Sequence, residues 1–303
     1  MAVKSVAIVG SGLIGRAWAM IFARGGYAVR LYDAVPGVAA AAVGLCAQGL
    51  RDLAEAGLCA DPAAAAQRIT SAATLAEAVA GVTLVQENGP EQVEIKRAIF
   101  AELDRLSPPD AILASSSSAI RISLFASDLA GRARCLIAHP VNPPHLIPLV
   151  ELSGADFTAA EVIDAARAIY DEIGQVPITV LKEVEGFILN RLQGALLAEA
   201  FRLVDEGYVT PQDLDKTVKD GLGLRWAFMG PFETIELNAP GGIPDYCARY
   251  TGFYKRLAAE PPAPAVYDTP RVAEQWDAVS DIPEKMRWRD RKLAALRAHK
   301  QKD

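Results

Sequence analysis

The sequence predicts an α/β protein, built from a doubly wound, mostly parallel sheet followed by a smaller all-α C-terminal domain. Strand and helix patterns alternate from the N-terminus to about residue 181. A glycine-rich turn joins the first strand to the first helix. From residue 184 onward the pattern is helical throughout. We therefore expect two domains, at residues 1–183 and 184–303.

Composition supports a large core and excludes several classes of partner. The 303 residues are 51% apolar and 22% charged, with a net charge of −6 and a pI of about 5.3. This acidic balance argues against a nucleic-acid binder, and the basic segment 287–292 fits a solvated helix face. No apolar run approaches the roughly 18–20 residues of a membrane span. The N-terminus lacks a signal-peptide layout, so we expect a cytoplasmic protein.

The cysteines do not predict a metal site. The chain has four of them, with no CxxC spacing between any two. Such a pattern is typical of free thiols in a reducing compartment. We therefore expect neither zinc nor disulfides at Cys46, Cys59, Cys135 and Cys247.

The N-terminal segment predicts a β-α-β unit. Residues 4–10 form a short, nearly all-apolar run, as expected for a strand that is buried on both faces. A helical pattern over residues 16–24 ends at the Gly25-Gly26 pair, which is a C-cap signal. A second strand follows at residues 28–32. The unit has the length of about 30 residues that the motif requires.

The turn between this strand and helix has the spacing of a dinucleotide-binding fingerprint. Gly10 permits a tight turn, Gly12 lets a pyrophosphate approach the backbone, and Gly15 lets the helix pack closely on the strand. The helix N-terminus, at Leu13 and Ile14, then faces the phosphates. We therefore expect a Rossmann-type domain.

An acid at the end of the second strand favours NAD as the cofactor. Asp33 lies 23 residues past Gly10. Its carboxylate is suited to bond the adenosine ribose hydroxyls and to repel a 2′-phosphate, which favours NAD over NADP. FAD binding and a glycine turn without a ligand are the competing interpretations of this fingerprint.

Four further segments continue the strand–helix alternation. Strands are predicted near residues 68–72, 82–87, 111–114 and 177–181, with alanine-rich or amphipathic helices between them. The strand at 111–114 ends in the serine run 115–118. A serine run can be a simple loop. At the carboxyl end of a parallel strand, however, it faces the crevice in which open α/β sheets bind ligands.

The segment from His139 to Glu151 predicts an acid–base pair. Four prolines between residues 140 and 148 exclude a helix or an interior strand, so a stiff loop joins two buried apolar runs. His139 would lie at the end of the first run and Glu151 on the second. A carboxylate on one ring nitrogen fixes the tautomer and leaves the other nitrogen free as a base. A histidine with a purely structural role is the alternative.

The C-terminal region predicts helices only. One stretch, residues 187–203, is apolar on more than one side, which indicates burial between domains or subunits. A hinge-like turn is expected at 221–223 and a proline loop at 261–264. Helices are predicted at 185–205, 210–219, 231–238, 244–258 and from 283 onward.

Seven motifs follow one another along the chain. They are the glycine fingerprint with Asp33, Glu91-Gln-Val-Glu-Ile-Lys96, the serine run to Ser118, His139-x-x-Asn142-Pro143, Leu149-Val150-Glu151, Gly186-Phe187-Ile188-Leu189-Asn190-Arg191 and Gly230-Pro231-Phe232-Glu233. Together they resemble the 3-hydroxyacyl-CoA dehydrogenase superfamily over essentially the full chain. Within the superfamily, the segments 9–20, 138–144, 189–193 and 221–231 are most similar to the lambda-crystallin and L-gulonate 3-dehydrogenase branch.

The resemblance implies a role for each matched residue. His139 is similar to the family's catalytic base and Glu151 to its orienting partner. Ser118 matches a serine that bonds the reacting oxygen, and Asn190 an asparagine that holds the same region. Glu91 and Lys96 match positions near the nicotinamide ribose. The family commonly has Asn and Thr where this chain has Ser116 and Ser117, so which hydroxyl of the run is used stays open.

A second departure concerns the substrate. The acyl-CoA enzymes usually have Pro-Met before Gly-Pro-Phe, whereas this chain has the segment 225–229, which begins with Arg225. An arginine at a cleft edge suits a small carboxylate, although a surface salt bridge would also explain it.

The resemblance therefore implies NAD-dependent oxidation of a small L-3-hydroxy acid of the L-gulonate type, by a homodimer. A 3-hydroxyacyl-CoA and L-carnitine are the alternative substrates. A crystallin-like structural protein without turnover is the alternative of another class.

Overall fold

The computed structural model describes residues 4–258, 270–276 and 280–301. They form two compact units. The first runs to Asn190 and includes the segment from Asp281, and the second spans Arg191–Ser280. The predicted division at residue 184 stays a prediction, and the predicted loop at 261–264 lies outside the described residues. None of the described helices combines the length and the apolar character that crossing a membrane requires.

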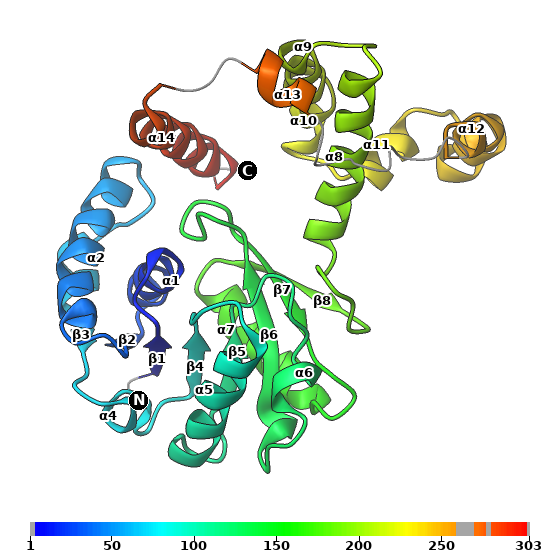
Figure 1. The fold of residues 1–303 in the computed structure, drawn as a ribbon. Helices are drawn as coiled ribbons and strands as arrows, with labels where there is room; N and C mark the ends of the chain where they lie inside the picture. Colours follow the sequence, from blue (N-terminus) through cyan, green and yellow to red (C-terminus); the bar gives the residue numbers. More distant parts are fainter. Residues whose placement is uncertain (1–3, 259–269, 277–279, 302–303) are drawn as a thin grey trace. The chain divides into compact units, whose positions relative to one another are not determined.

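The first unit is built on one eight-stranded sheet (Figure 1). Its order is β3-β2-β1-β4-β5-β6-β7-β8, and every neighbouring pair is parallel except β6 with β7. The predicted doubly wound, mostly parallel sheet is confirmed. The strands are β1 (Ser5–Val9), β2 (Ala28–Tyr32), β3 (Ile69–Ser71), β4 (Leu84–Glu87), β5 (Ile112–Ser115), β6 (Cys135–Pro140), β7 (Leu149–Ser153) and β8 (Val176–Val180).

Helices cover both faces of this sheet, because its central strands are apolar on both sides. On β1, Val6 and Ile8 join one buried cluster, while Ala7 and Val9 join the other. The first cluster packs against α1 (Leu13–Arg24), α2 (Val38–Glu55), α3 (Pro62–Gln67), α7 (Ala160–Glu172) and α14 (Ile282–Lys300). The second packs against α4 (Leu75–Val79), α5 (Val93–Leu106) and α6 (Ser123–Ala126). The 3₁₀ helix η1 (Arg132–Arg134) precedes β6.

The direction of winding reverses between β1 and β4. From β1 the chain builds β2 and β3 on one side, then returns to add β4 and β5 on the other. In such sheets the reversal opens a crevice at the carboxyl ends of the strands. The glycine turn after β1 and the serine run after β5 both lie at these carboxyl ends.

One strand pair brings the two ends of the proline-rich loop together. The antiparallel register of β6 and β7 places His139 opposite Glu151 and Pro140 opposite Val150. Residues 141–148 form the connection, which contains a cis peptide bond between Asn142 and Pro143.

The second unit is helical, as predicted. The helix α8 (Leu189–Asp205) begins four residues later than the sequence pattern suggested. The expected hinge at 221–223 is wrong, because these residues continue a helical path through η2, a π-helix, into α10. The remaining elements are α9 (Pro211–Lys216), η2 (Thr217–Leu222), α10 (Gly223–Trp226), α11 (Pro231–Leu237), α12 (Gly242–Ala258) and α13 (Pro270–Gln275).

Candidate active site

The glycine turn has the geometry that its spacing predicts. Gly10 has a φ of +89°, and a Cβ there would lie 2.8 Å from the Asn88 carbonyl oxygen. A Cβ at Gly15 would lie 1.9 Å from the Gly10 carbonyl oxygen, so only glycine lets α1 pack this closely on the turn. A Cβ at Gly12 would meet nothing within 4 Å. Gly12 therefore borders open space, which is where a pyrophosphate would approach.

The start of α1 fits an anionic group. The helical hydrogen bonds begin with the Arg16 amide, which donates to the Gly12 carbonyl at 3.0 Å. The amides of the first turn, from Leu13 to Gly15, therefore have no acceptor inside the helix and are available to phosphate oxygens. These residues fit a dinucleotide.

Asp33 lies immediately after β2, and the glycine turn holds its carboxylate in place. The Ser11 amide donates to Oδ2 at 2.8 Å, and the Val35 amide donates to Oδ1 at 3.0 Å. Each carboxylate oxygen still has a lone pair free for a hydroxyl donor. The structure therefore brings the predicted ribose-binding acid to the glycine turn.

His139 and Glu151 are in direct contact. His139 Nδ1 lies 2.8 Å from Glu151 Oε2, and the two side chains are almost completely buried, at 4% and 0% exposure. The Phe187 ring lies against the imidazole, with ring centroids 5.5 Å apart. The histidine is thus fixed by a carboxylate on one nitrogen and by an aromatic ring beside it.

Glu151 also holds the chain that leads into α8. Its Oε1 accepts hydrogen bonds from the amides of Ile188 and Leu189, both at 2.9 Å. Gly186 and Phe187, just before them, have positive φ angles of 74° and 49°. Burial opposes ionisation of Glu151, but the bonds from His139 and from the two amides outweigh it and hold the pKa of Glu151 below its usual value.

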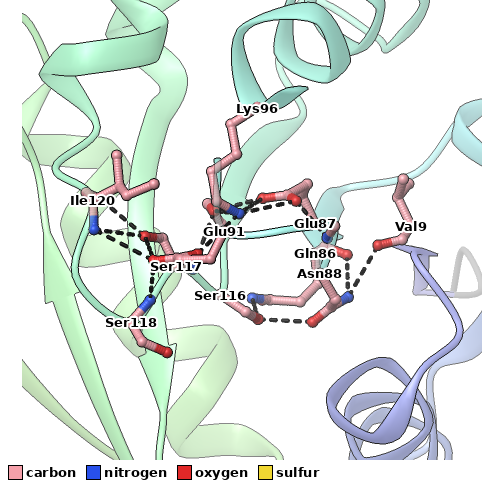
Figure 2. A network of polar contacts seen from close by, with 12 residues as sticks. Val9, Gln86, Glu87, Asn88, Glu91, Lys96, Ser116, Ser117, Ser118 and Ile120 are labelled. Atoms are coloured by element: carbon pink, nitrogen blue, oxygen red, sulfur yellow. Dashed lines mark hydrogen bonds and ion pairs between the residues drawn. The ribbon is translucent and has the colours of Figure 1, made fainter. Parts of the chain in front are cut away.

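The structure separates the four serines by what their hydroxyls already bind, and Figure 2 shows Ser116, Ser117 and Ser118. Ser115 donates to Glu87 Oε2 at 2.5 Å, and Ser117 donates to Glu91 Oε1 at 2.6 Å. The Ser116 hydroxyl donates to Asn88 Oδ1 at 2.7 Å and accepts bonds from Gln86 and Trp18. Ser118 is exposed, and its hydroxyl has no partner among the described residues.

Glu91 shapes the turn that presents Ser118. Its Oε1 accepts the Ser118 amide at 2.9 Å and the Ala119 amide at 3.1 Å, in addition to the Ser117 hydroxyl. Burial opposes ionisation of Glu91, but the Ser117 hydroxyl, the Lys96 ammonium and these amides hold its pKa below the usual value.

Lys96 links Glu91 to a second, fully buried carboxylate. Its Nζ lies 3.5 Å from Glu91 Oε2 and 3.1 Å from Glu87 Oε2. Lys96 is 1% exposed and Glu87 is 0% exposed. Figure 2 shows the ammonium between the two carboxylates, at the end of the sheet that carries the serine run. A buried cation with two carboxylates is electrostatically compensated. The Lys96 ammonium thus fixes the Glu91 carboxylate that holds the turn of Ser118.

Asn190 lies at the start of α8 and reaches the serine turn. Its Nδ2 donates to the Ser118 carbonyl oxygen at 2.7 Å. The structure thus places the predicted asparagine and the predicted serine in contact within the first unit.

Arg225 belongs to the second unit, on α10. It is exposed, and its guanidinium makes no hydrogen bond or ion pair with another described residue. The salt-bridge alternative therefore has no partner in the described part of the chain. The assignment of Arg225 to the substrate stays a prediction.

Sequence reasoning missed two residues of this region. Glu87 anchors Lys96 and Ser115, yet the sequence shows it only as the end of an apolar run. The signal available was a charged residue at the carboxyl end of a buried strand. Phe187 was expected to be helical but occupies a left-handed turn beside His139. Across the described ranges, no group of three His, Cys, Asp or Glu side chains could hold a metal ion.

Comparison with known proteins gives consistent matches over most of the chain. The NAD binding domain of 3-hydroxyacyl-CoA dehydrogenase matches residues 5–184, and the C-terminal domain of the same family matches residues 186–273. Lambda-crystallin from Oryctolagus cuniculus is 46% identical over 84% of this chain and 81% of its own length. L-carnitine dehydrogenase from Streptomyces griseus is 39% identical over 88% of this chain and 80% of its own length.

A solved structure agrees with these matches. The chain is similar to an NAD⁺-dependent dismutase, 5-formyl-3-hydroxy-2-methylpyridine 4-carboxylic acid 5-dehydrogenase. The TM-score is 0.83 and the sequence identity 30%, over 97% of both chains.

Gly12 and Gly15 give a matched test of the cofactor turn, because a Cβ at Gly15 would meet backbone and a Cβ at Gly12 would not. Gly15→Ala should lower the melting temperature sharply, because overpacking costs about 1–3 kcal/mol or more and backbone lies 1.9 Å from the new Cβ. Gly12→Ala should melt like the wild type but bind NADH more weakly, because its Cβ enters the open space. Thermal unfolding and NADH fluorescence titration measure both effects. Wild-type NADH affinity in Gly12→Ala would contradict the proposed pyrophosphate position.

Proposed function

The chain belongs to the 3-hydroxyacyl-CoA dehydrogenase family, and we propose that it oxidises the 3-hydroxyl group of a small, free L-3-hydroxy acid with NAD⁺, in the manner of L-gulonate 3-dehydrogenase. Members of the family are NAD-dependent dehydrogenases that act on 3-hydroxy groups. The observation that carries the proposal is the buried His139–Glu151 pair, which the start of α8 links to Ser118: Glu151 accepts the Leu189 amide, and Asn190 donates to the Ser118 carbonyl.

His139 acts as the general base in this proposal. Because Glu151 is ionised, its Oε2 accepts a hydrogen bond from the Nδ1–H group of His139. The other ring nitrogen, Nε2, then keeps a free lone pair. Nε2 takes the proton of the 3-hydroxyl group as the hydride leaves C3. Glu151 keeps the ring in one tautomer and stabilises the imidazolium that forms.

Ser118 and Asn190 stabilise the developing oxyanion. The Ser118 hydroxyl is the one of its run that is free to donate, because the other three are already bonded. Asn190 uses one amide hydrogen on the Ser118 carbonyl and keeps the second for the reacting oxygen. Donors that are fixed before the reaction need no reorganisation during it.

NAD⁺, when bound, supplies the acceptor for the hydride. Gly10, Gly12 and Gly15, with Leu13 and Ile14 at the helix end, hold its pyrophosphate in this proposal. Asp33 bonds the adenosine ribose. Glu91 and Lys96 would lie near its nicotinamide ribose. They belong to the segment at the start of α5, where Glu91 also holds the turn that carries Ser118.

Arg225 binds the substrate carboxylate in this proposal. Its exposed guanidinium is free to form two parallel hydrogen bonds to a carboxylate. L-carnitine, named in one relative, is itself a free 3-hydroxy acid. A carboxylate anchor would therefore suit both L-gulonate and L-carnitine.

The protein is proposed to form a homodimer through its helical unit. Among the described residues of this unit, six large apolar side chains are between 64% and 74% exposed in the single chain. Soluble proteins usually cover apolar surface of this kind, and a two-fold dimer is the commonest way to do so. The residues are Leu192, Tyr208, Leu224, Phe228, Phe232 and Leu237.

His139→Gln tests the assigned base. Turnover should fall by about 10²–10⁴-fold, because positioned acid–base catalysis supplies a factor of that size. NADH affinity should remain at the wild-type value, since His139 lies outside the glycine turn. Steady-state rates and NADH fluorescence titration measure the two effects. Near wild-type turnover would show that another group is the base.

A substrate panel tests the carboxylate anchor. NADH formation is followed with L-gulonate, L-3-hydroxybutyrate, L-carnitine and L-3-hydroxybutyryl-CoA. We expect efficient turnover of a free acid, with a KM that rises at least about tenfold in Arg225→Ala, as loss of a charged hydrogen bond predicts. The control is Arg249→Ala, which removes an arginine that already pairs with Asp245 in the same unit.

The other outcomes of the panel separate the alternatives. A strong preference for the thioester would identify an acyl-CoA enzyme and contradict the role of Arg225. Absence of turnover on every compound, with NADH binding intact, would favour a crystallin-like structural role.

Sedimentation velocity tests the oligomer. The expected mass is about twice the single-chain value of 32.3 kDa. A species with the mass of one chain at micromolar concentration would contradict the homodimer.

A further inference from the structure

The C-terminal helix α14 returns to the first unit and inserts a buried arginine there. Arg297 is 6% exposed. Its Nη1 donates to the His145 carbonyl at 2.9 Å, and its Nη2 donates to the Gly174 carbonyl at 2.9 Å and to Gln175 Oε1 at 3.2 Å. The guanidinium thus joins the loop between β6 and β7 to the turn between α7 and β8.

The loop that Arg297 holds lacks several backbone donors, because three of its residues, Pro143, Pro144 and Pro148, are prolines. The Pro144 carbonyl accepts a bond from Gln175 Nε2 at 3.3 Å, directly beside the bond from Arg297 to His145. The Pro148 carbonyl accepts the Val176 amide at 2.8 Å. Within the loop, the Leu146 and Ile147 amides both donate to the Pro143 carbonyl at 3.0 Å. The side chains of Arg297 and Gln175 attach this turn to the rest of the first unit.

The attachment of α14 depends on its C-terminal half. Its earlier residues, including Arg287, Asp290 and Arg291, line a cavity of about 620 Å³ that also borders α2 and His145. Leu293, Ala294 and Ala298 pack against the core cluster of the first unit. Arg297 lies within this packed half, so its hydrogen bonds secure the helix and the loop together.

We propose that Arg297 and Gln175 are positioning residues for the reaction: they hold the tip of the loop whose two ends carry His139 and Glu151. This proposal rests on the proposed role of His139. Moving the guanidinium away would break three hydrogen bonds and leave a buried charge without partners, so this clamp of Arg297 and Gln175 resists displacement. A misplacement of about 1 Å at a reacting group can cost about 10²-fold in rate.

Arg297→Met tests the clamp, because it keeps the length of the side chain and removes every donor. We expect kcat to fall about tenfold or more, while NADH affinity stays within about twofold. Arg297→Lys should recover part of the rate, because an ammonium can still reach one carbonyl. Hydrogen–deuterium exchange of residues 141–148 should rise in the methionine variant and fall again in the lysine variant.

Arg134→Met is the matched control. Arg134 is also a buried arginine, at 8% exposure, and it donates to the Ala111 carbonyl and to Asp104, at the other end of β6. Its loss should lower the melting temperature and leave kcat within about twofold. An equal loss of kcat in this control would show general loosening and overturn the proposal. So would an Arg297→Met enzyme with unchanged kcat, or with unchanged exchange at 141–148.

A second variant covers the case in which Arg297→Met does not fold. Gln175→Met removes the bond to Pro144 and one acceptor of Arg297 without leaving a charge unpaired. It should raise exchange at 141–148 and lower kcat, and wild-type behaviour in both would overturn the proposal. The exchange experiment does not depend on turnover. Failure of the clamp is therefore distinct from failure of the proposed function, which full activity in His139→Gln would reveal.

Discussion

The arrangement of this site depends on one buried carboxylate. Glu151 is 0% exposed and binds the His139 ring through one oxygen and two backbone amides through the other. Burying an ionised carboxylate costs several kcal/mol unless it is fully hydrogen-bonded. These three bonds satisfy it, and they tie together β6, β7 and the start of α8. The tautomer of the histidine and the starting point of a helix are thus set by the same side chain.

A second set of charges stabilises the serine turn of the site. The Lys96 ammonium lies between the carboxylates of Glu87 and Glu91, and Glu91 in turn holds the amides of the serine turn. All of these bonds are made by residues of the chain itself. A turn held in this way is preorganised, which reduces the entropy lost on binding.

The sequence predicted those features that depend on local order along the chain. The β-α-β unit follows from apolar runs and glycine spacing, and the pairing of His139 with Glu151 follows from a proline loop between two strands. The resemblance pointed to Ser118, but local order left open which hydroxyl of the run is used. The partners that occupy a neighbouring hydroxyl, Trp18 and Gln86 on Ser116, come from elements distant in sequence. The start of α8 was predicted too early because the helical pattern continues through residues 185–188. In that segment the Ile188 and Leu189 amides donate to Glu151, which is distant in sequence, and this contact fixes the backbone before the helix begins.

The first unit is discontinuous along the chain, and this has a consequence for its synthesis. The ribosome completes the sheet by about residue 180, but α14 emerges only after the whole helical unit. Until then the His145 carbonyl of the proline loop lacks the guanidinium that binds it in the finished protein. The nascent chain can thus fold its cofactor-binding half early, while the loop beside His139 is completed only by the last helix. Order in this loop would then report that the chain has been synthesised through α14.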